Sequence, residues 1–336
     1  MAATTLEVIT SLPGLLELQP EWTSLVRSLN YTTPFHLPEW LLTWWKHFGS
    51  GQLHVFAFRR GSVLAGLIPC FLHEWQGLRQ LTLIGTGISD YLDPPLAGKS
   101  QIFDLLKHHL ASNPHWDICS WQDLSADSPL AQAFKAYVTE DMPCSAIPLE
   151  GSFDEYWRNR PHGLRRNLRR YGEKASRIDT PQFRVVCNAD PELTEALIRL
   201  HTDRWKDQGE QGMIVANRSA GFLREVVQQL DDEEMVRFFS LSFQGEIVAI
   251  ILGFLYRNNF FSYLSGFHPA YEPYGFGRHL LYESIKYAFE HRFIAWNFLR
   301  GDEPYKFSWG AKPIQKSRLI IRSQQSPELA CGARPL

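Results

Sequence analysis

The sequence lacks the features that mark secreted, membrane-spanning or metal-binding proteins. Its five cysteines are scattered and form no Cys-x-x-Cys pair, which argues against a zinc site and a disulfide framework and favours a reducing compartment. The most apolar stretch, residues 247–256, is too short to span a bilayer. The N-terminal segment has no basic start and no long apolar core, so we expect no signal peptide. We therefore expect a cytoplasmic protein with no membrane span and no bound metal.

The chain also lacks an excess of charge of one sign. The formal net charge is −2, so no global field attracts nucleic acid or an anionic membrane, and we expect no specific DNA binding. Any polyanion would have to bind a local patch. Apolar residues are plentiful: 44% of the chain is hydrophobic, with 11 Trp, 12 Tyr and 22 Phe. This composition supports sizeable cores, and a length of 336 residues favours two domains.

Two segments of the sequence share a pattern. Residues 53–71 and 236–256 each contain two apolar runs around a glycine, which is typical of a β-hairpin. In both, an alanine follows four residues after the glycine, as in Gly61 with Ala65 and Gly245 with Ala249. A strand, a loop, a helix and a strand come next in both. Hairpins share such patterns generically, but the common order predicts a duplicated α/β fold. We predict an N-terminal domain over 1–150, a C-terminal domain over 151–325 and a tail over 326–336.

Hydrophobic periodicity and turn residues predict the other elements. In the first half we expect helices over residues 14–29, 38–48, 101–111 and 128–137, and strands over 6–9, 78–84, 116–121 and 144–149. In the second half we expect helices over 153–158, 161–177, 191–206, 218–230 and 276–291, and strands over 183–187, 260–266, 294–299 and 317–322.

A glycine turn between a strand and a helix predicts a phosphate site. Backbone amides at the start of a helix are unpaired and the helix dipole favours an anion there, while glycine lets the backbone come close to it. The strand over residues 260–266 leads to such a turn and then to an amphipathic helix. We predict that the residues that bind the phosphate group of a ligand or cofactor are Tyr274, Gly275, Phe276, Gly277 and Arg278. Glycines before a helix are also ordinary turn elements.

The sequence resembles the CelD-type (BioF2-like) acetyltransferases, a branch of the GNAT acetyltransferases, and more distantly the Fem-type peptidyltransferases. The segments that carry the resemblance are PEWLLTWW (38–45), SDYLDP (89–94), RRNLRR (165–170), LHTDRW (200–205), YGFGRHLL (274–281) and FLRGDEPYKFSWGA (298–311). It implies tandem GNAT-like halves, each a mixed, mostly antiparallel sheet flanked by helices, with a degenerate first half on the acceptor side. It also implies that the glycine turn holds the pyrophosphate of acyl-CoA (acetyl-CoA).

One position departs from the GNAT loop pattern, which is Gln/Arg-x-x-Gly-x-Gly. Here the first position is acidic, Glu272, which weakens the expectation of ordinary CoA binding. An acyl-carrier protein or an aminoacyl-tRNA is therefore an alternative donor.

A charged cluster directly follows the strand over residues 294–299. Loops at strand ends often carry catalytic groups, and acyl transfer needs a base for the nucleophile and an acid for the leaving thiolate. We predict Glu303 or Asp302 as the base, Tyr305 as the acid, and Lys306 as an oxyanion-stabilising group or a partner of Asp302. The same residues also fit a helix start, with Asp302 as the cap and Lys306 in solvent.

Two further segments are candidates for substrate binding. The SDYLDP loop offers Asp90, Tyr91 and Asp93 as an acceptor-side wall, although Asp-Pro-Pro also favours a plain turn. On the helix over residues 191–206, Arg204 and Trp205 can line a ligand channel or pack on the sheet.

The segment over residues 158–177 is the most basic in the chain. At helical spacing its anion patch pairs like charges, which repel, so an anion is a natural partner. The patch consists of Arg165, Arg166, Arg169 and Arg170. CoA phosphates, tRNA, an acidic carrier protein or a polyanionic acceptor would each fit, and so would acidic residues of the chain itself.

The leading hypothesis is an acyltransferase that moves an acyl group from acyl-CoA or a similar thioester to an amine or hydroxyl. The acceptor would be a small molecule or saccharide, in polysaccharide or cell-envelope biosynthesis. A Fem-like transferase that uses aminoacyl-tRNA is the second hypothesis. A non-catalytic binding module that uses the basic helix is the third.

Overall fold

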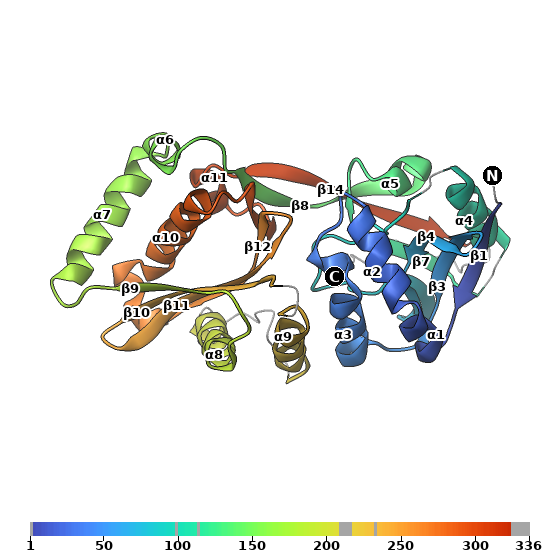
Figure 1. Ribbon diagram of the computed structural model, residues 1–336, viewed down its shortest axis with the longest axis horizontal. Coiled ribbons are helices and arrows are strands. Elements are labelled where there is room, and N and C mark those ends of the chain that lie inside the picture. The colour runs from blue at the N-terminus through green and yellow to red at the C-terminus, as the bar shows by residue number, and fades with distance from the viewer. Residues whose placement is uncertain (1–2, 98–99, 113–114, 208–216, 232–233, 324–336) are drawn as a thin grey trace. The chain divides into compact units, whose positions relative to one another are not determined.

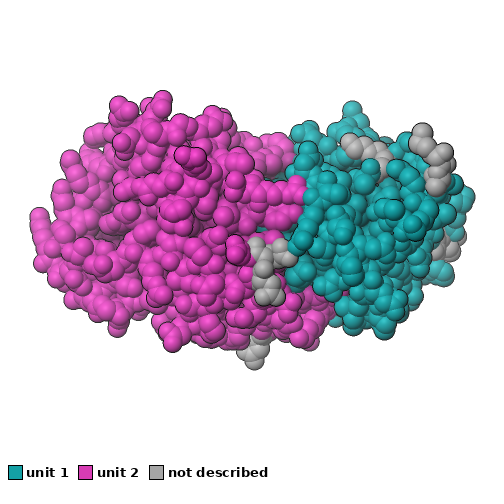
Figure 2. Space-filling view, viewed as in Figure 1, with its two compact units in different colours: residues 1–41, 49–141, 316–336 teal, residues 42–48, 142–315 magenta. Residues whose placement is uncertain are grey.

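The computed structural model describes residues 3–97, 100–112, 115–207, 217–231 and 234–323 (Figure 1). The chain divides into two compact units (Figure 2). The first contains residues 1–41, 49–141 and 316–336, and the second contains residues 42–48 and 142–315. The predicted tail over 326–336 lies outside the described residues.

Both units are mixed α/β structures. The first has an antiparallel sheet in the order β1-β3-β4 and a second row of strands in the order β2-β5-β6-β7-β14, in which β6 and β7 are parallel. Its strands are β1 (Thr4–Ile9), β2 (Gln52–Leu53), β3 (Val55–Arg60), β4 (Val63–Ile68), β5 (Cys70–Trp75), β6 (Leu78–Leu83), β7 (Ile118–Ser125) and the second part of β14 (Lys312–Arg322). Its helices are α1 (Leu12–Glu17), α2 (Gln19–Ser28), η1 (Pro34–His36), the first turn of α3 (Pro38–Phe48), α4 (Ser100–Ser112), α5 (Pro129–Ala133) and η2 (Lys135–Tyr137).

The second unit has one row of strands in the order β8-β13-β12-β11-β10-β9, in which β12 and β13 are the parallel neighbours. Its strands are the second part of β8 (Val138–Pro148), β9 (Gln182–Val186), β10 (Val236–Phe243), β11 (Glu246–Tyr256), β12 (Asn259–Phe267) and β13 (Ala295–Arg300). Its helices are α6 (Phe153–Arg158), α7 (His162–Ser176), α8 (Pro191–Asp207), α9 (Asn217–Gln229), η3 (Pro269–Tyr274), α10 (Phe276–Glu290) and α11 (Pro304–Ser308).

The hairpin β10–β11 forms as its sequence predicts. Gln244 and Gly245 both have positive φ, 52° and 80°, which is the geometry of a tight hairpin turn. Residues Val248–Phe254 are buried without interruption, because helices cover both faces of this sheet. Figure 1 shows α7 and α10 on one face and α8 on the other.

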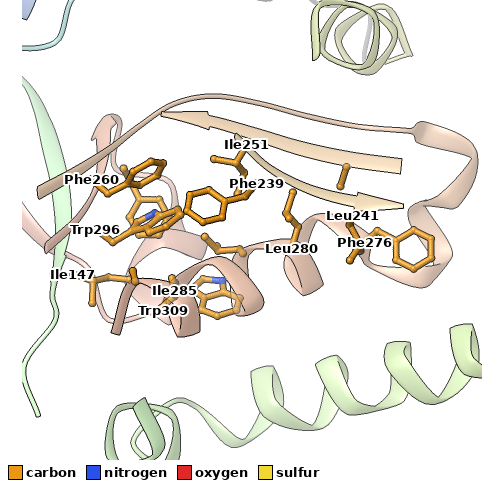
Figure 3. Packing of buried hydrophobic residues seen from close by; sticks show 14 of the residues in the cluster. Ile147, Phe239, Leu241, Ile251, Phe260, Phe276, Leu280, Ile285, Trp296 and Trp309 are labelled. Carbon is orange, nitrogen blue, oxygen red and sulfur yellow. The ribbon is translucent and has the colours of Figure 1, made fainter. Parts of the chain in front are cut away.

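The core between this sheet and α10 is built from large rings and aliphatic side chains. Phe239, Phe260 and Trp296 come from three strands and meet Leu280 and Ile285 of α10 (Figure 3). The rings of Phe260 and Trp296 lie 4.3 Å apart between centroids. Since each such side chain contributes about 1.5–3 kcal/mol on burial, this cluster fixes α10, and with it the turn that precedes α10.

The same connection occurs once in each unit. The strand β6 leads through α4 to the parallel strand β7, as β12 leads through α10 to β13, and each parallel pair spans three residue pairs. The duplicated order predicted from the sequence is therefore present as two parallel crossovers. In each unit the second strand of the crossover also pairs with a strand outside that crossover: β7 pairs with β14, which follows it in the chain, and β13 pairs with β8, which precedes it.

Two predicted helices differ from the structure, and the strand β5 was missed. The helix expected over residues 14–29 is two helices, since Pro20 in the first turn of α2 has no amide to continue α1. The helix expected over 128–137 is the short α5 followed by η2. Strand β5 was not predicted as a separate strand, because its first apolar residues directly continue the apolar run of the preceding hairpin.

None of the helices in the described part of the chain has the length and apolarity needed to cross a membrane.

Candidate active site

The two turns predicted to carry donor binding and catalysis leave the same edge of the sheet. Strands β12 and β13 are parallel neighbours, so their carboxyl ends point in one direction. Their pairing covers Asn259–Phe261 with Ala295–Asn297, and then β12 continues to Phe267 and β13 to Arg300. The two strands thus diverge after their paired residues. Strand β12 leads to the Tyr274–Arg278 turn, and β13 leads to the Asp302–Lys306 segment.

The turn before α10 contains a left-handed residue where the sequence places glycine. Gly275 has φ 61° and ψ 32°, and it is the N-cap residue of α10. Its carbonyl accepts from the amides of Arg278 and His279. Within the described chain, the amides of Phe276 and Gly277 donate to no backbone carbonyl. These two amides are the donors that the turn offers to an anion.

The reason for glycine at position 275 differs from the prediction. A Cβ there would lie 2.5 Å from the ring of Tyr171 on α7, whereas a Cβ on Gly277 would be in ordinary contact with Phe267 at 3.4 Å. Gly275 is therefore required by its positive φ and by Tyr171, and the close approach of an anion is not needed to explain it. The side chains of Tyr274 and Phe276 pack on Phe243, so these two residues contribute packing and backbone.

The basic helix α7 lies beside this turn. The guanidinium of Arg278 is 5.9 Å from the ring centre of Tyr171 and its Nη1 lies 3.4 Å from the Tyr171 hydroxyl. Lys174 is 4.7 Å from the ring centre of Tyr274 and donates to the carbonyl of Pro273. The structure thus brings the predicted phosphate turn and the predicted anion patch onto adjacent elements.

The four arginines of the anion patch differ in exposure. Arg166, Arg169 and Arg170 are exposed, while Arg165 is half-buried and its Nε donates to the carbonyl of Arg160. Arg169 forms an ion pair with Glu173 at 3.6 Å. The exposed arginines are therefore the part of the patch that a partner can reach.

Strand β13 ends in a bulge next to the charged cluster. Leu299 has a left-handed φ of 63° although it is not glycine, which is a strained conformation for a branched side chain. The side-chain oxygen of Asn297 accepts a hydrogen bond of 2.8 Å from the Leu299 amide. This bond compensates the strain and directs the chain from β13 into Gly301 and Asp302.

Lys306 has a structural environment that the sequence did not reveal. Its side chain is 3% exposed, and its Nζ donates to the carbonyls of Arg300 and Gly301 at 2.6 and 3.2 Å. The third contact is an ion pair of 2.9 Å with Glu303. The predicted pairing of Lys306 with Asp302 and the alternative placement in solvent are both wrong, because α11 begins after Glu303 and points the lysine inward.

The remaining charged and phenolic groups of the segment are accessible. Glu303, not Asp302, occupies the N-cap position of α11, and its carboxylate folds back over Gly301, whose φ is 110°. Asp302 is exposed. Tyr305 is 49% exposed, with its ring edge-on to Phe298. A reacting group can therefore reach the predicted base and acid. To stabilise an oxyanion, the buried ammonium of Lys306 would first have to give up one of its bonds to a backbone carbonyl.

The SDYLDP loop belongs to the first unit. Asp93 is 7% exposed and both its oxygens accept from the amide of Ser125. Lys316 lies behind it, with its ammonium 4.0 Å from the Asp93 carboxylate and 4.0 Å from the Tyr91 ring centre. Asp93 therefore holds the loop, and its geometry does not support the predicted role in substrate binding. Asp90 and Tyr91 are half-buried.

Arg204 and Trp205 lie in the last two turns of α8, and their side chains are outside the described residues. A cavity of about 610 Å³ lies at the far end of α10, where Phe289 and Arg292 line it. A cavity of about 880 Å³ lies in the first unit beside His108 and His109. Neither is lined by a predicted site residue. No group of three or more potential metal ligands occurs among the described residues.

Residues 162–307 match the family model of the acetyltransferase (GNAT) domain. This part of the chain is similar to GNAT acetyltransferase domains. The match includes α7, the turn before α10 and the first turn of α11. No curated protein matches the sequence significantly.

Solved structures extend the likeness over most of the chain. FemX shares 12% sequence identity and a TM-score of 0.62 over 90% of this chain and 96% of its own. A conserved protein of unknown function from Bacteroides thetaiotaomicron shares 12% identity and a TM-score of 0.64 over 95% of this chain and 100% of its own. A tandem GNAT protein from the clavulanic acid biosynthesis pathway shares 11% identity and a TM-score of 0.52 over 96% and 100%. At these identities the likeness concerns the fold, and the predicted fold class, tandem GNAT-like α/β halves, is confirmed.

Three residues around the candidate site were missed by the sequence-based prediction. Tyr171 covers Gly275, Lys174 reaches the Pro273 carbonyl, and Asn297 holds the β13 bulge. A signal for Tyr171 existed: Leu164, Leu168, Tyr171 and Ala175 recur at helical spacing and face inward in α7. Asn297 gave no signal, because a bulge depends on the partner strand.

Proposed function

We propose that the protein is an acyltransferase that moves an acyl group from a thioester donor to an amine or hydroxyl acceptor. The observation that carries the proposal is the divergence of β12 and β13 after three paired residues, between the turn before α10 and the segment before α11. An extended, amide-containing arm can lie along the edge of β12 that β13 leaves, as an added strand would. Its phosphate end would face the α10 turn and its thioester the charged segment.

Acyl-CoA is the donor that the GNAT domain favours. The amides of Phe276 and Gly277 and the guanidinium of Arg278 would hold its phosphates, with Lys174 nearby. Glu272 is exposed in the same turn, and its carboxylate repels a group with several negative charges. The residues present therefore fit a phosphate-bearing arm, with fewer cations at the turn itself than a pyrophosphate would favour.

The chemistry would be direct transfer. Glu303 or Asp302 would take the proton of the acceptor amine or hydroxyl as it attacks the thioester carbonyl. The carbon–sulfur bond then breaks, and Tyr305 would give its proton to the thiolate. The Lys306 ammonium would hold Glu303 and the carbonyls of β13 in place, and in that way position the base.

The acceptor would be a small molecule or a saccharide, in polysaccharide or cell-envelope biosynthesis in the cytoplasm. This part of the proposal rests on the resemblance to CelD-type enzymes. The aminoacyl-tRNA alternative is favoured by one observation, the exposed arginines of α7 next to the donor turn.

Thioester turnover tests the proposal. The full chain would be mixed with acetyl-CoA and a panel of amino sugars and amines, and thiol release would be followed with a chromogenic disulfide. We expect acceptor-dependent release that falls about 100-fold or more in Tyr305→Phe and Glu303→Gln, because each removes a proton-transfer group. Glu290→Gln, an exposed residue at the other end of α10, is the control.

Binding measurements separate a failure of the proposed mechanism from a failure of the transferase proposal. Acetyl-CoA should raise the thermal midpoint of the wild type and not of Arg278→Glu. Full turnover in both Tyr305→Phe and Glu303→Gln would exclude the proposed acid–base mechanism. If no thioester binds or is cleaved, the transferase proposal is wrong.

A further inference from the structure

The outward face of α7 carries an unusual excess of cations. This 15-residue helix buries Leu168 and Ala175, and its opposite side is exposed. Glu173 is the one acidic residue on that side. The exposed basic residues at this face are Arg166, Arg169, Arg170, Lys174 and the C-cap residue Arg177. Within the described chain, only Arg169 among them forms an ion pair with a carboxylate.

Aromatic rings, rather than carboxylates, support the cations nearest the donor turn. Arg170 lies 5.4 Å and Arg278 5.9 Å from the ring centre of Tyr171, and Lys174 lies 4.7 Å from that of Tyr274. A ring face stabilises a cation without occupying its N–H donors. Apart from the bonds of Lys174 to the Pro273 carbonyl and of Arg278 to the Tyr171 hydroxyl, the donors of these cations stay available to an anion from outside. The surface is continuous with the α10 turn.

We propose that this face of α7 docks an acidic carrier protein that delivers the acyl group on a phosphopantetheine arm. The proposal rests on the proposed transferase function and names its donor. Carboxylates of one helix of the carrier would lie along α7. The phosphate of the arm would reach Arg278 and the α10 turn, and the thioester would continue toward Glu303 and Tyr305.

Free CoA explains only part of this surface. From Arg166 to Arg177 the cations extend over about 16 Å of helix at 1.5 Å per residue, whereas the phosphates of a nucleotide gather at a few adjacent side chains. The turn itself carries Glu272, which disfavours a pyrophosphate more than the single phosphate of a carrier-bound arm. The remaining arginines then need another anionic partner, and a negatively charged helix supplies one.

A protein partner fits the charge distribution better than RNA does. Proteins that bind nucleic acid mostly carry a positive field over a domain, whereas this chain has a net charge of −2 and concentrates its basic residues on one helix. Arg166 and Arg170 lie four residues apart, and like charges at that spacing repel. Carboxylates at the matching spacing on a facing helix would relieve this repulsion.

The test measures dissociation constants of the full chain for four probes at two salt concentrations. The probes are a purified acetylated acyl-carrier protein, the same carrier without its phosphopantetheine arm, acetyl-CoA and unacylated tRNA. The variant Arg166→Glu/Arg177→Glu reverses charge at both ends of the α7 face, away from Tyr171. Arg292→Glu, an exposed arginine at the far end of α10, is the matched control.

We expect the acetylated carrier to bind more weakly to the α7 variant by about tenfold or more, since two exposed attractions become repulsions. Acetyl-CoA binding should stay within about twofold, and the control should bind every probe as the wild type does. Removal of the arm should weaken but not abolish carrier binding.

Three results would overturn the inference. The first is equal binding of the carrier to the wild type and the α7 variant. The second is a loss of acetyl-CoA binding alone in the variant. The third is salt-sensitive binding of tRNA without binding of the carrier. In each of these cases thioester binding can persist and the transferase proposal stands. If neither acetyl-CoA nor the acetylated carrier binds or loses its acyl group, the proposed function itself has failed.

Discussion

Lys306 shows how a residue of the candidate active site is tied to the fold. Its ammonium binds two carbonyls at the end of β13 and the Glu303 carboxylate. We expect Lys306→Met to lower the free energy of unfolding by about 2–4 kcal/mol, because it leaves buried carbonyls and a carboxylate unsatisfied. Urea denaturation measures the effect. Lys312→Met, at an exposed position, should change stability by less than about 0.5 kcal/mol; equal losses in both would mean that the buried contacts do not matter.

The two glycines of the donor turn should respond differently to alanine. Gly275→Ala places a Cβ against Tyr171 at positive φ, so we expect a loss of about 1–3 kcal/mol in unfolding free energy. Gly277→Ala adds a methyl group in ordinary contact with Phe267, inside a helix, and should be neutral or slightly stabilising. Thermal denaturation of the two variants checks this order. A stable Gly275→Ala would show that Tyr171 can move aside.

His36 should make the first unit sensitive to acid. Burial lowers the pKa of His36 to about 4, against an opposing effect of the nearby Asp93 charge. The unfolded chain then binds a proton below about pH 6.5 that the folded chain does not, so stability falls from pH 6.5 down to about pH 4. Between pH 7 and pH 5 the loss is about 2 kcal/mol.

Comparison of wild type with His36→Gln at pH 7 and pH 5 isolates this contribution. The variant loses the bond from the Thr33 amide to the ring, so its absolute stability is expected to fall. Its stability should nevertheless depend less on pH in this window. An unchanged pH dependence would mean that His36 titrates alike in both states.

At the scale of elements, the bulge of β13 decides where the charged segment points. The register shifts between Asn297 and Leu299 opposite β8, and the Asn297 side chain closes the bulge. We expect Asn297→Leu to cost about 1–3 kcal/mol, since a buried amide loses its acceptor. Because the bulge leads into Gly301, thioester turnover should fall more than binding. Turnover and acetyl-CoA affinity measured on the same sample separate the two, with Asn259→Leu at the half-buried start of β12 as the control.

The sequence predicted those elements whose signals are local. The hairpin around Gly245, helix α10 and the turn at Gly275 each follow from glycine positions and a 3.6-residue period, and the structure contains them. The burial of Lys306 could not be predicted, because it depends on the one-residue difference between a cap at Asp302 and a cap at Glu303. The fit of Tyr171 over Gly275 joins residues about 100 positions apart in the sequence, which a local pattern does not report.

Across the whole chain, the second strand of each parallel crossover pairs with a strand that lies outside that crossover. Residues Cys144–Pro148 of β8 pair with Arg300–Ala295 of β13 in the second unit, and residues 316–322 of β14 pair with β7 in the first. A boundary drawn at residue 150, as the sequence suggests, separates β8 from the strand with which it pairs.

Fragments of the second unit test how much β8 contributes. We expect residues 142–315 to be the more soluble and stable fragment, and residues 151–315 to aggregate or melt well below it. Without β8, the edge of β13 is exposed, and an exposed edge strand is a template for aggregation. The loss would also uncover the contacts of Ile147, which is 1% exposed and worth about 2–3 kcal/mol by burial alone. Light scattering and thermal denaturation compare the fragments. Equal solubility and midpoints would mean that β13 is a tolerated edge, and that the second unit does not depend on β8.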